Sequence, residues 1–554
     1  MDIRRLVIYA GLAISSYMLI ITWNQDYGSE PVEVAQTSTA TIEPFVDDAP
    51  STVDQVTETA EAPDVSEQPE TTPDVPVINE PSTDLISVVT DVLQVEINPK
   101  GGEIVSVRLP EYPRSNEYKD IPFTLLENSN NRTFVAQSGL LGRDGVDKDG
   151  GALYQVAKTS YQLADDADTL EVVLTTTTDK AEVAKVFTFT RGQYLMDVRY
   201  QVRNTSQEPW QGVFYAQLKR DGSPDPSQST SMGMAAYLGA ALTTSEERYM
   251  KVKFDDLEEA KFKQVEEGGW AAILQHYFVS AWIPAQDQQH TYNGRYVRGN
   301  YIFGFYDNAV TVAPGETANI GAQLYAGPKI QDRLEEIAEN LNLVIDYGIL
   351  WWLAQPLFWL LDLIHDYVGN WGVAIILLTV LIKLSFFKLS AMSYRSMANM
   401  RKVAPKMAKI KERYGDNREK LGQEMMKLYK TEKINPLSDC LPILVQMPVF
   451  IALYWVLMES VELRQAPFFL WIEDLSIKDP LFVLPLLMGA SMFIQMRLNP
   501  TPPDPMQARV MQLMPVIFTV FFLWFPAGLV LYWVVNNVLS IAQQYVITKQ
   551  IENS

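Results

Sequence analysis

Six long apolar runs alternate with polar stretches along the 554 residues of the chain. One run lies at residues 6–23, and five more follow in the last third, at 372–389, 441–458, 481–496, 511–525 and 528–547. A helix needs about 20 mostly apolar residues to cross the hydrocarbon core of a bilayer. The pattern therefore predicts an α-helical membrane protein with six spans, four of them within residues 439–548.

The first apolar run predicts an uncleaved signal anchor over residues 1–24. Arg4 and Arg5 precede the run, and it ends Ile-Ile-Thr-Trp-Asn without the small residues of a cleavage site. A removed signal peptide is the alternative. The two arginines place the N-terminus in the cytoplasm, so the segment that follows is expected to be exported.

Residues 25–84 are rich in Pro, Glu, Asp, Thr and Ser and show no sustained periodicity. No Lys or Arg occurs between Arg5 and Lys100. Such a composition buries too little apolar surface to offset the entropy of ordering. We expect a disordered acidic linker, and a simple tether is favoured over a binding role.

Alternating polar and apolar residues over 85–328 predict strands. Residues 92–97 and 104–109 flank the turn residues 98–102, which is a hairpin pattern, and further alternation follows at 170–175, 186–190 and 196–202. A large all-β sandwich fits this length. We find no nucleophile elbow, glycine-rich phosphate loop or partnered histidine in it, so a structural or docking role is favoured over a hidden ligand groove.

Residues 329–371 predict linking and interfacial helices. Apolar positions at spacings of four, three and four indicate an amphipathic helix over 329–343. The Trp-rich stretch 348–361 contains Pro356 and is too short to span comfortably, so we expect it in the outer interface, with a true span as the alternative.

Charge sets the topology of the remaining segments. Thirteen basic residues against five acidic ones between 388 and 433 place the segment 390–438 in the cytoplasm. Arg497 and Arg509 mark a second inward loop, and Lys549 lies on a short cytoplasmic tail, 549–554. The result is a multi-pass protein with both termini inside.

The cytoplasmic segment predicts an antiparallel helical hairpin, with a turn at 414–417. Methionines recur along both of its helices, at Met397, Met400, Met407, Met425 and Met426. A methionine-rich face suits adaptable binding of varied apolar segments, but simple packing between the two helices explains the same spacing. Both interpretations stay open.

Composition excludes several classes of function. The net charge of −22 argues against nucleic acid as a partner. The one cysteine, Cys440, allows no intramolecular disulfide, and the three histidines show no metal-ligand spacing. We therefore expect neither a metal site nor a cofactor.

One cation interrupts an apolar run. Lys383 lies near the centre of 372–389, where a charge costs about 2.5–3.5 kcal/mol, with Thr379 one turn before it. Gln446 lies in the next run, and the last run carries a polar stripe at Tyr532, Asn536, Ser540 and Gln543. We predict a hydrated cavity lined by Lys383, Thr379, Gln446, Tyr532 and Asn536. Snorkelling of Lys383 and hydrogen bonding between helices are the alternatives.

Several short segments, in this order, resemble the YidC family of membrane protein insertases. They are 435–437 (Asn-Pro-Leu), 446–450 (Gln-Met-Pro-Val-Phe), 461–468 (Val-Glu-Leu-Arg-Gln-Ala-Pro-Phe), 514–518 (Met-Pro-Val-Ile-Phe) and 525–533 (Phe-Pro-Ala-Gly-Leu-Val-Leu-Tyr-Trp). The resemblance implies a periplasmic β-supersandwich, a five-helix core, and a groove open to cytoplasm and lipid. Trp524 and Trp533 join the expected groove residues. Many members carry Arg where this chain has Lys383, and the short tail lacks the basic ribosome-binding extension of some relatives.

The resemblance implies a non-enzymatic insertase and chaperone of the bacterial inner membrane. Lys383 would attract the acidic leading segment of a nascent membrane protein, and the hairpin methionines would receive it first. The implied partners are nascent membrane proteins, the lipid bilayer and the Sec translocon, with the ribosome and signal recognition machinery as further candidates. A secondary transporter using Lys383 is the main alternative, although no repeated halves are found. A structural scaffold is the third.

Overall fold

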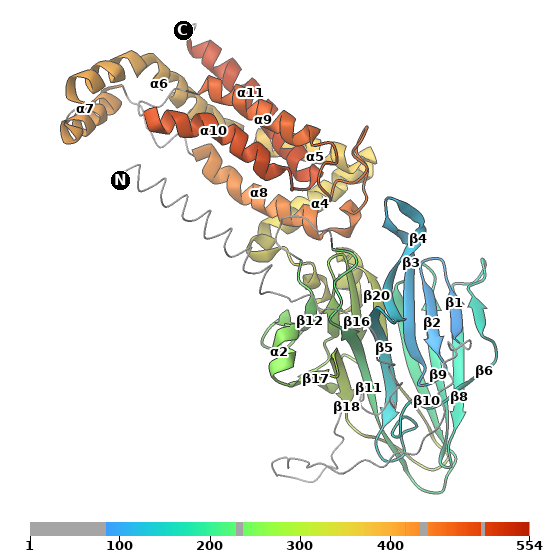
Figure 1. Ribbon diagram of the computed structural model, residues 1–554. Coiled ribbons are helices and arrows are strands. Elements are labelled where there is room, and N and C mark those ends of the chain that lie inside the picture. The colour runs from blue at the N-terminus through green and yellow to red at the C-terminus, as the bar shows by residue number, and fades with distance from the viewer. Residues whose placement is uncertain (1–84, 229–235, 416, 433–440, 500–504, 553–554) are drawn as a thin grey trace, which may run out of the picture.

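The computed structural model describes residues 85–228, 236–415, 417–432, 441–499 and 505–552, which form a β-sandwich and a helical part (Figure 1). The expected anchor at 1–24 and linker at 25–84 lie outside these residues. The sandwich contacts one end of the helical part, and the described end of α11 (Ala527–Glu552) lies at the other end (Figure 1).

Two sheets build the sandwich, which confirms the all-β prediction for this domain. In spatial order the larger sheet contains β14 (Phe262–Glu267), β17 (Gln289–Val297), β18 (Asn300–Asp307), β11 (Trp210–Asp221), β5 (Arg132–Leu141), β4 (Tyr118–Ser129), β3 (Glu103–Ser115), β2 (Gln94–Asn98), β1 (Ile86–Val89) and β7 (Ser160–Gln162), with β19 (Val310–Val312) beside β11. The smaller sheet contains β13 (Met250–Val252), β12 (Gly239–Leu242), β15 (Ala271–Leu274), β16 (Phe278–Ile283), β20 (Thr317–Pro328), β10 (Leu195–Asn204), β9 (Ala181–Thr190), β8 (Thr169–Thr177) and β6 (Gln155–Val156).

The alternating polar and apolar residues of the strands correspond to alternating exposed and buried side chains. Along β10, Met196, Val198, Tyr200 and Val202 are buried, while Arg199 and the other intervening side chains are more exposed. Successive side chains of a strand point to opposite faces, so these residues fill the space between the sheets. A short helix, α2 (Phe254–Glu259), lies against the sandwich.

The described helices of the C-terminal part begin with α3 (Gln331–Ile337), η2 (Leu341–Val344), η3 (Gly348–Leu350) and α4 (Trp351–Val368). They continue with α5 (Trp371–Ser385), α6 (Phe387–Tyr414), α7 (Arg418–Thr431), α8 (Leu441–Glu459), η5 (Val461–Leu463), α9 (Val483–Leu498), α10 (Pro505–Phe522) and α11 (Ala527–Glu552). The helices α6 and α7 form an antiparallel pair at the end remote from the sandwich (Figure 1).

Two predicted helices have different bounds. The helix expected over 329–343 is broken, because Ala338 is extended and Asn340 adopts a left-handed conformation with φ 63°. The stretch 348–361 begins as η3 and continues as α4 to Val368, with Pro356 inside the helix as its sixth residue. Gly369, with φ 66°, ends it.

The span expected over 372–389 is wrong as a single helix. The helix α5 ends at Ser385, and α6 starts at Phe387 with a bend of 67° between them. The Ser385 hydroxyl donates to the carbonyl oxygen of Leu381 at 3.1 Å, a contact that bends helices. Lys383 therefore lies in the last turn of α5 and not near the middle of a span.

Judged by length and hydropathy, none of the described helices reaches the requirement for a membrane crossing alone, and only the bent α5–α6 pair meets it jointly.

Candidate functional site

Lys383 joins α5 to α11. Its ammonium donates to the Ser540 hydroxyl at 2.7 Å, and that hydroxyl donates to the carbonyl oxygen of Asn536 one turn earlier, also at 2.7 Å. Lys383 is half-buried, while Ser540 and Asn536 are buried. Among the residues that the structure describes, no carboxylate pairs with this ammonium. The site thus holds a positive charge that is bonded only to a neutral group.

A small cavity lies beside Lys383, between α8 and the junction of α5 with α6. Its lining includes Lys383, Phe386, Ser390, Gln446 and Val449, and its volume is about 20 Å³. A cavity of this size has room for about one water molecule. The structure therefore brings Lys383 and Gln446 to one cavity, but this cavity is far smaller than a groove for a polypeptide.

Thr379 and Tyr532 were expected in the same lining and are not part of it. Thr379 is buried, and its hydroxyl donates to the carbonyl oxygen of Ile375 at 2.6 Å within its own helix. The buried Tyr532 hydroxyl is turned towards Gln446 without a well-formed hydrogen bond. Asn536 contacts the site through its backbone carbonyl oxygen, which accepts a hydrogen bond from the Ser540 hydroxyl.

The two tryptophans of the expected site lie in different surroundings. Trp533 packs in an aromatic cluster, with its ring centroid 4.8 Å from that of Phe450 and 5.4 Å from that of Phe522. Trp524 lies between α10 and α11 and is 37% exposed. Neither is among the residues that line the cavity.

The polar stripe on α11 also bonds to neighbouring helices. The amide of Gln543 donates to the carbonyl oxygen of Phe387 at 3.1 Å, which, like the Ser540 contact, favours a role in holding the bundle together. Sequence reasoning missed Ser390 in the cavity and Asn537, whose amide donates to the Ser491 hydroxyl at 3.0 Å. Asn537 was missed because it lies next to the stripe, on a different face of α11.

Most of the hairpin methionines pack against other helices. Met407 is buried, and Met400 and Met425 pack with it between α6 and α7. Met397 packs against the end of α11. Met426, in contrast, is 53% exposed.

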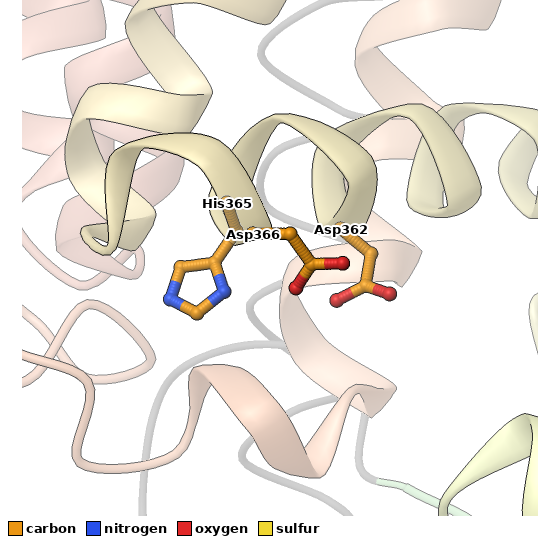
Figure 2. Close-up of side chains that lie close together, drawn as sticks. All are labelled: Asp362, His365 and Asp366. Carbon is orange, nitrogen blue, oxygen red and sulfur yellow. The ribbon is translucent and has the colours of Figure 1, made fainter.

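Three side chains with potential metal-ligand atoms lie together on α4 (Figure 2). Asp362, His365 and Asp366 offer ligand atoms within 4.8 Å of one another, because spacings of three and four share one helix face. The sequence interpretation that no histidine has metal-ligand spacing was therefore too narrow for His365. The His365 ring stacks on Trp371 with centroids 4.0 Å apart. Partly exposed carboxylates at this spacing are common without an ion, and the group supports no metal assignment.

Comparisons with known proteins cover nearly the whole chain. The family described as "YidC periplasmic domain" matches residues 85–360, and the family "60Kd inner membrane protein" matches residues 363–554. Curated proteins named membrane protein insertase YidC are 55% identical in Stutzerimonas stutzeri and 54% identical in Pseudomonas fluorescens. Each alignment covers 100% of this chain and 99% of the relative.

A solved structure described as an active YidC insertase with its first transmembrane domain resolved is 19% identical, with a TM-score of 0.38. It covers 84% of this chain and 93% of the other. The identity and coverage of the curated relatives are sufficient by themselves: this chain belongs to the YidC family of membrane protein insertases.

Proposed function

We propose that this chain inserts proteins into the bacterial inner membrane, and that Lys383 attracts the acidic, hydrophilic leading segment of each substrate. The observation that carries the proposal is the ammonium of Lys383, which lies between α5, α8 and α11 and bonds to the neutral Ser540 hydroxyl. Family membership supports the insertase activity itself.

The physical basis is electrostatic. A polar segment that enters hydrocarbon without partners loses its hydration, at a cost of several kcal/mol per unsatisfied group. A cation with no carboxylate partner in the described part of the chain attracts the negative charge of such a segment. At about 4 Å and an effective dielectric constant near 20, the attraction is about 4 kcal/mol.

The helices must separate before a substrate can enter. The cavity of about 20 Å³ lies between α8 and the α5–α6 bend, so parting α8 from α5 would enlarge it into the hydrophilic groove expected from the family. Apolar side chains on both helices, Leu381 and Leu384 on α5 and Met447 and Ile451 on α8, are exposed. They offer the apolar part of the substrate a path into lipid, and burial there drives its release.

The proposed topology places both termini in the cytoplasm and the sandwich in the periplasm. In this arrangement the five core spans are α5, α8, α9, α10 and α11. The α6–α7 hairpin and the described end of α11 lie at the cytoplasmic end. Their position remote from the sandwich supports this placement (Figure 1). Met426 would meet the substrate first. The α4 helix, with Trp351, Trp352 and Trp359 exposed, would lie in the outer interface.

Partners follow from the activity and the family. Nascent membrane proteins and the lipid bilayer are required by insertion itself, and we propose the Sec translocon, the ribosome and the signal recognition machinery as further partners. A chaperone role follows from holding a span before it folds. No covalent step is needed for any of these roles, so the proposal invokes neither a cofactor nor a metal.

Site-specific crosslinking tests the proposal. A photoreactive amino acid at Gln446, in the cavity, should crosslink to a nascent membrane protein during insertion. The same amino acid at Leu486, 61% exposed on α9, serves as the control for random lipid-phase encounters. Equal yields at both positions, or none at Gln446, would exclude a path beside Lys383.

A further inference from the structure

The periplasmic sandwich hydrogen-bonds to the outer end of α8. Its loop between β15 and β16 carries His276, whose Nε2 donates to the carbonyl oxygen of Met458 at 2.7 Å. His276 is only 2% exposed, and its backbone N–H donates to the Asp225 carboxylate at 2.6 Å. The ring is therefore fixed from its own domain when it meets α8.

A buried ion pair lies beside this contact. The Lys329 ammonium, one residue after β20, is 3.8 Å from the carboxylate of Glu459, the last residue of α8. Lys329 is 2% exposed and Glu459 is 3% exposed. Removing one partner of such a pair leaves an uncompensated charge in a buried site, which is strongly destabilising.

The contacts of His276 and Lys329 provide partners for the C-terminal end of α8. The last four carbonyl groups of an α-helix have no partner within the helix, and cations near that end are favoured by the helix dipole. Here the donor to Met458 and the cation beside Glu459 both come from the sandwich. The sandwich thus caps the C-terminus of α8 from another domain.

The segment after α8 is held by the same domain. Val461 is buried as a member of the hydrophobic core of the sandwich. Arg464 donates to the carbonyl oxygen of Pro113 at 2.9 Å and stacks over the rings of Phe123 and Phe278. Buried contacts of this kind restrict the motion of the two domains relative to each other.

We propose that His276 and Lys329 are positioning residues that set the orientation of α8, and through it the Gln446 wall of the cavity beside Lys383. Gln446 lies 13 residues before Glu459, about 20 Å along the helix at 1.5 Å per residue. A rotation or tilt at the capped end is carried along α8 to Gln446. The link to insertion rests on the function proposed above, whereas the orientation of α8 does not.

Spin-label distances in the full-length protein test the orientation directly. The labels are placed on cysteines at Leu381 on α5 and Ile451 on α8, both exposed, with Cys440 replaced by serine. Lys329→Met should shift or broaden the distance distribution and lower the insertion rate several-fold. Lys329→Met combined with Glu459→Met should restore both, because the buried charge is then gone. His276→Phe should perturb the distances, whereas His276→Gln, which keeps an N–H donor, should not.

Lys180→Met is the matched control. Lys180 also belongs to the sandwich, but it pairs with Asp144 and Glu208 of the same domain. It should leave the distances unchanged. A second label pair, on Val173 and Val265 of the sandwich, reports whether each variant keeps that fold. Unchanged α5–α8 distances in Lys329→Met with an intact sandwich would overturn the proposal. Shifted distances with a normal insertion rate would instead overturn the link to insertion.

Discussion

The ammonium of Lys383 and the hydroxyl of Ser540, 157 residues apart in sequence, form a 2.7 Å hydrogen bond that connects α5 with α11. The hydroxyl in turn donates a hydrogen bond to the carbonyl oxygen of Asn536. Because the acceptor is neutral, the bond solvates the cation without cancelling its charge. The bond thereby holds the Lys383 side chain in place, while its positive charge can still attract a substrate.

Ser540→Ala should weaken the contact between α5 and α11. Hydrogen bonds between membrane helices average about 0.6 kcal/mol and reach about 1.7 kcal/mol, so a loss in that range is expected in the unfolding of the purified protein in bilayers. Thr431→Ala is the control, since the Thr431 hydroxyl bonds within its own helix, to the carbonyl oxygen of Lys427 in α7. Equal effects of the two changes would argue against a special role for Ser540.

Gly489→Ala should destabilise the helical part. A Cβ at Gly489 would lie 2.0 Å from the Oγ1 of Thr519 on α10, so α9 and α10 would have to move apart. Such overpacking costs about 1–3 kcal/mol. Gly422→Ala, in α7 with nothing within 4 Å, should be neutral or stabilise by about 0.5–1 kcal/mol. Thermal unfolding of both variants gives the comparison, and a neutral Gly489→Ala would contradict the close approach.

Two methionines of the hairpin should respond differently to truncation. Met407→Ala creates a cavity between α6 and α7 and should cost about 2–5 kcal/mol, seen as faster amide hydrogen exchange in the hairpin. Met426→Ala removes an exposed side chain and should leave exchange unchanged while it lowers crosslinking of early nascent chains to the hairpin. Unchanged crosslinking would leave the hairpin methionines with a packing role alone.

His290 should make the sandwich more stable at acid than at alkaline pH. Burial lowers the pKa of His290, but the hydrogen bond and charge of Asp307, 2.6 Å away, outweigh it and raise the pKa above 6.5. Its other ring nitrogen meets the carbonyl oxygen of Ala285 at 2.7 Å, so both nitrogens donate in the charged form. A raised folded-state pKa gives stability that is complete below the unfolded value of about 6.5 and is lost as the pH rises through the folded value.

The measurement is the free energy of unfolding of the wild-type protein minus that of the His290→Gln variant, taken from about pH 5 to about pH 9. Taking the difference removes the contributions of other titrating groups such as Asp147 and Lys185. The difference should shrink as the pH rises. A difference that grows with pH would contradict the charged form of His290.

Local patterns in the sequence predicted the all-β class of the sandwich and five of its strands, β2, β3, β8, β9 and β10. The strand at Met196 to Val202 was visible because burial alternates with every residue, and the turn at 98–102 because its residues favour tight turns. The helical part was less predictable. The apolar run continues through Phe386 without Pro or Gly, and Ser385, whose hydroxyl bonds back to Leu381, was too weak a local signal to predict the bend that puts Lys383 in the last turn of α5.

Contacts between distant segments left no signal either. His276 and Met458 are 182 residues apart, and nothing in either neighbourhood indicates that a sandwich loop caps α8. The sequence showed that Lys383 and Ser540 are polar residues within apolar runs, but it did not show that they pair. The size of the cavity between them and Gln446 depends on side-chain packing, which periodicity does not determine.

The most direct test of the central claim is the insertion rate of a single-span protein with an acidic leading tail, compared with the same protein carrying a neutral tail. The rates are measured in vesicles containing the wild-type protein or the variants Lys383→Glu, Lys383→Arg and, as a control nearby on α6, Lys388→Glu. Lys383→Glu should slow the acidic tail at least about tenfold, since only about 1.4 kcal/mol of the attraction need be lost, and should slow the neutral tail much less. Lys383→Arg and Lys388→Glu should stay close to the wild type. Insertion of the acidic tail at the wild-type rate by Lys383→Glu would contradict the claim.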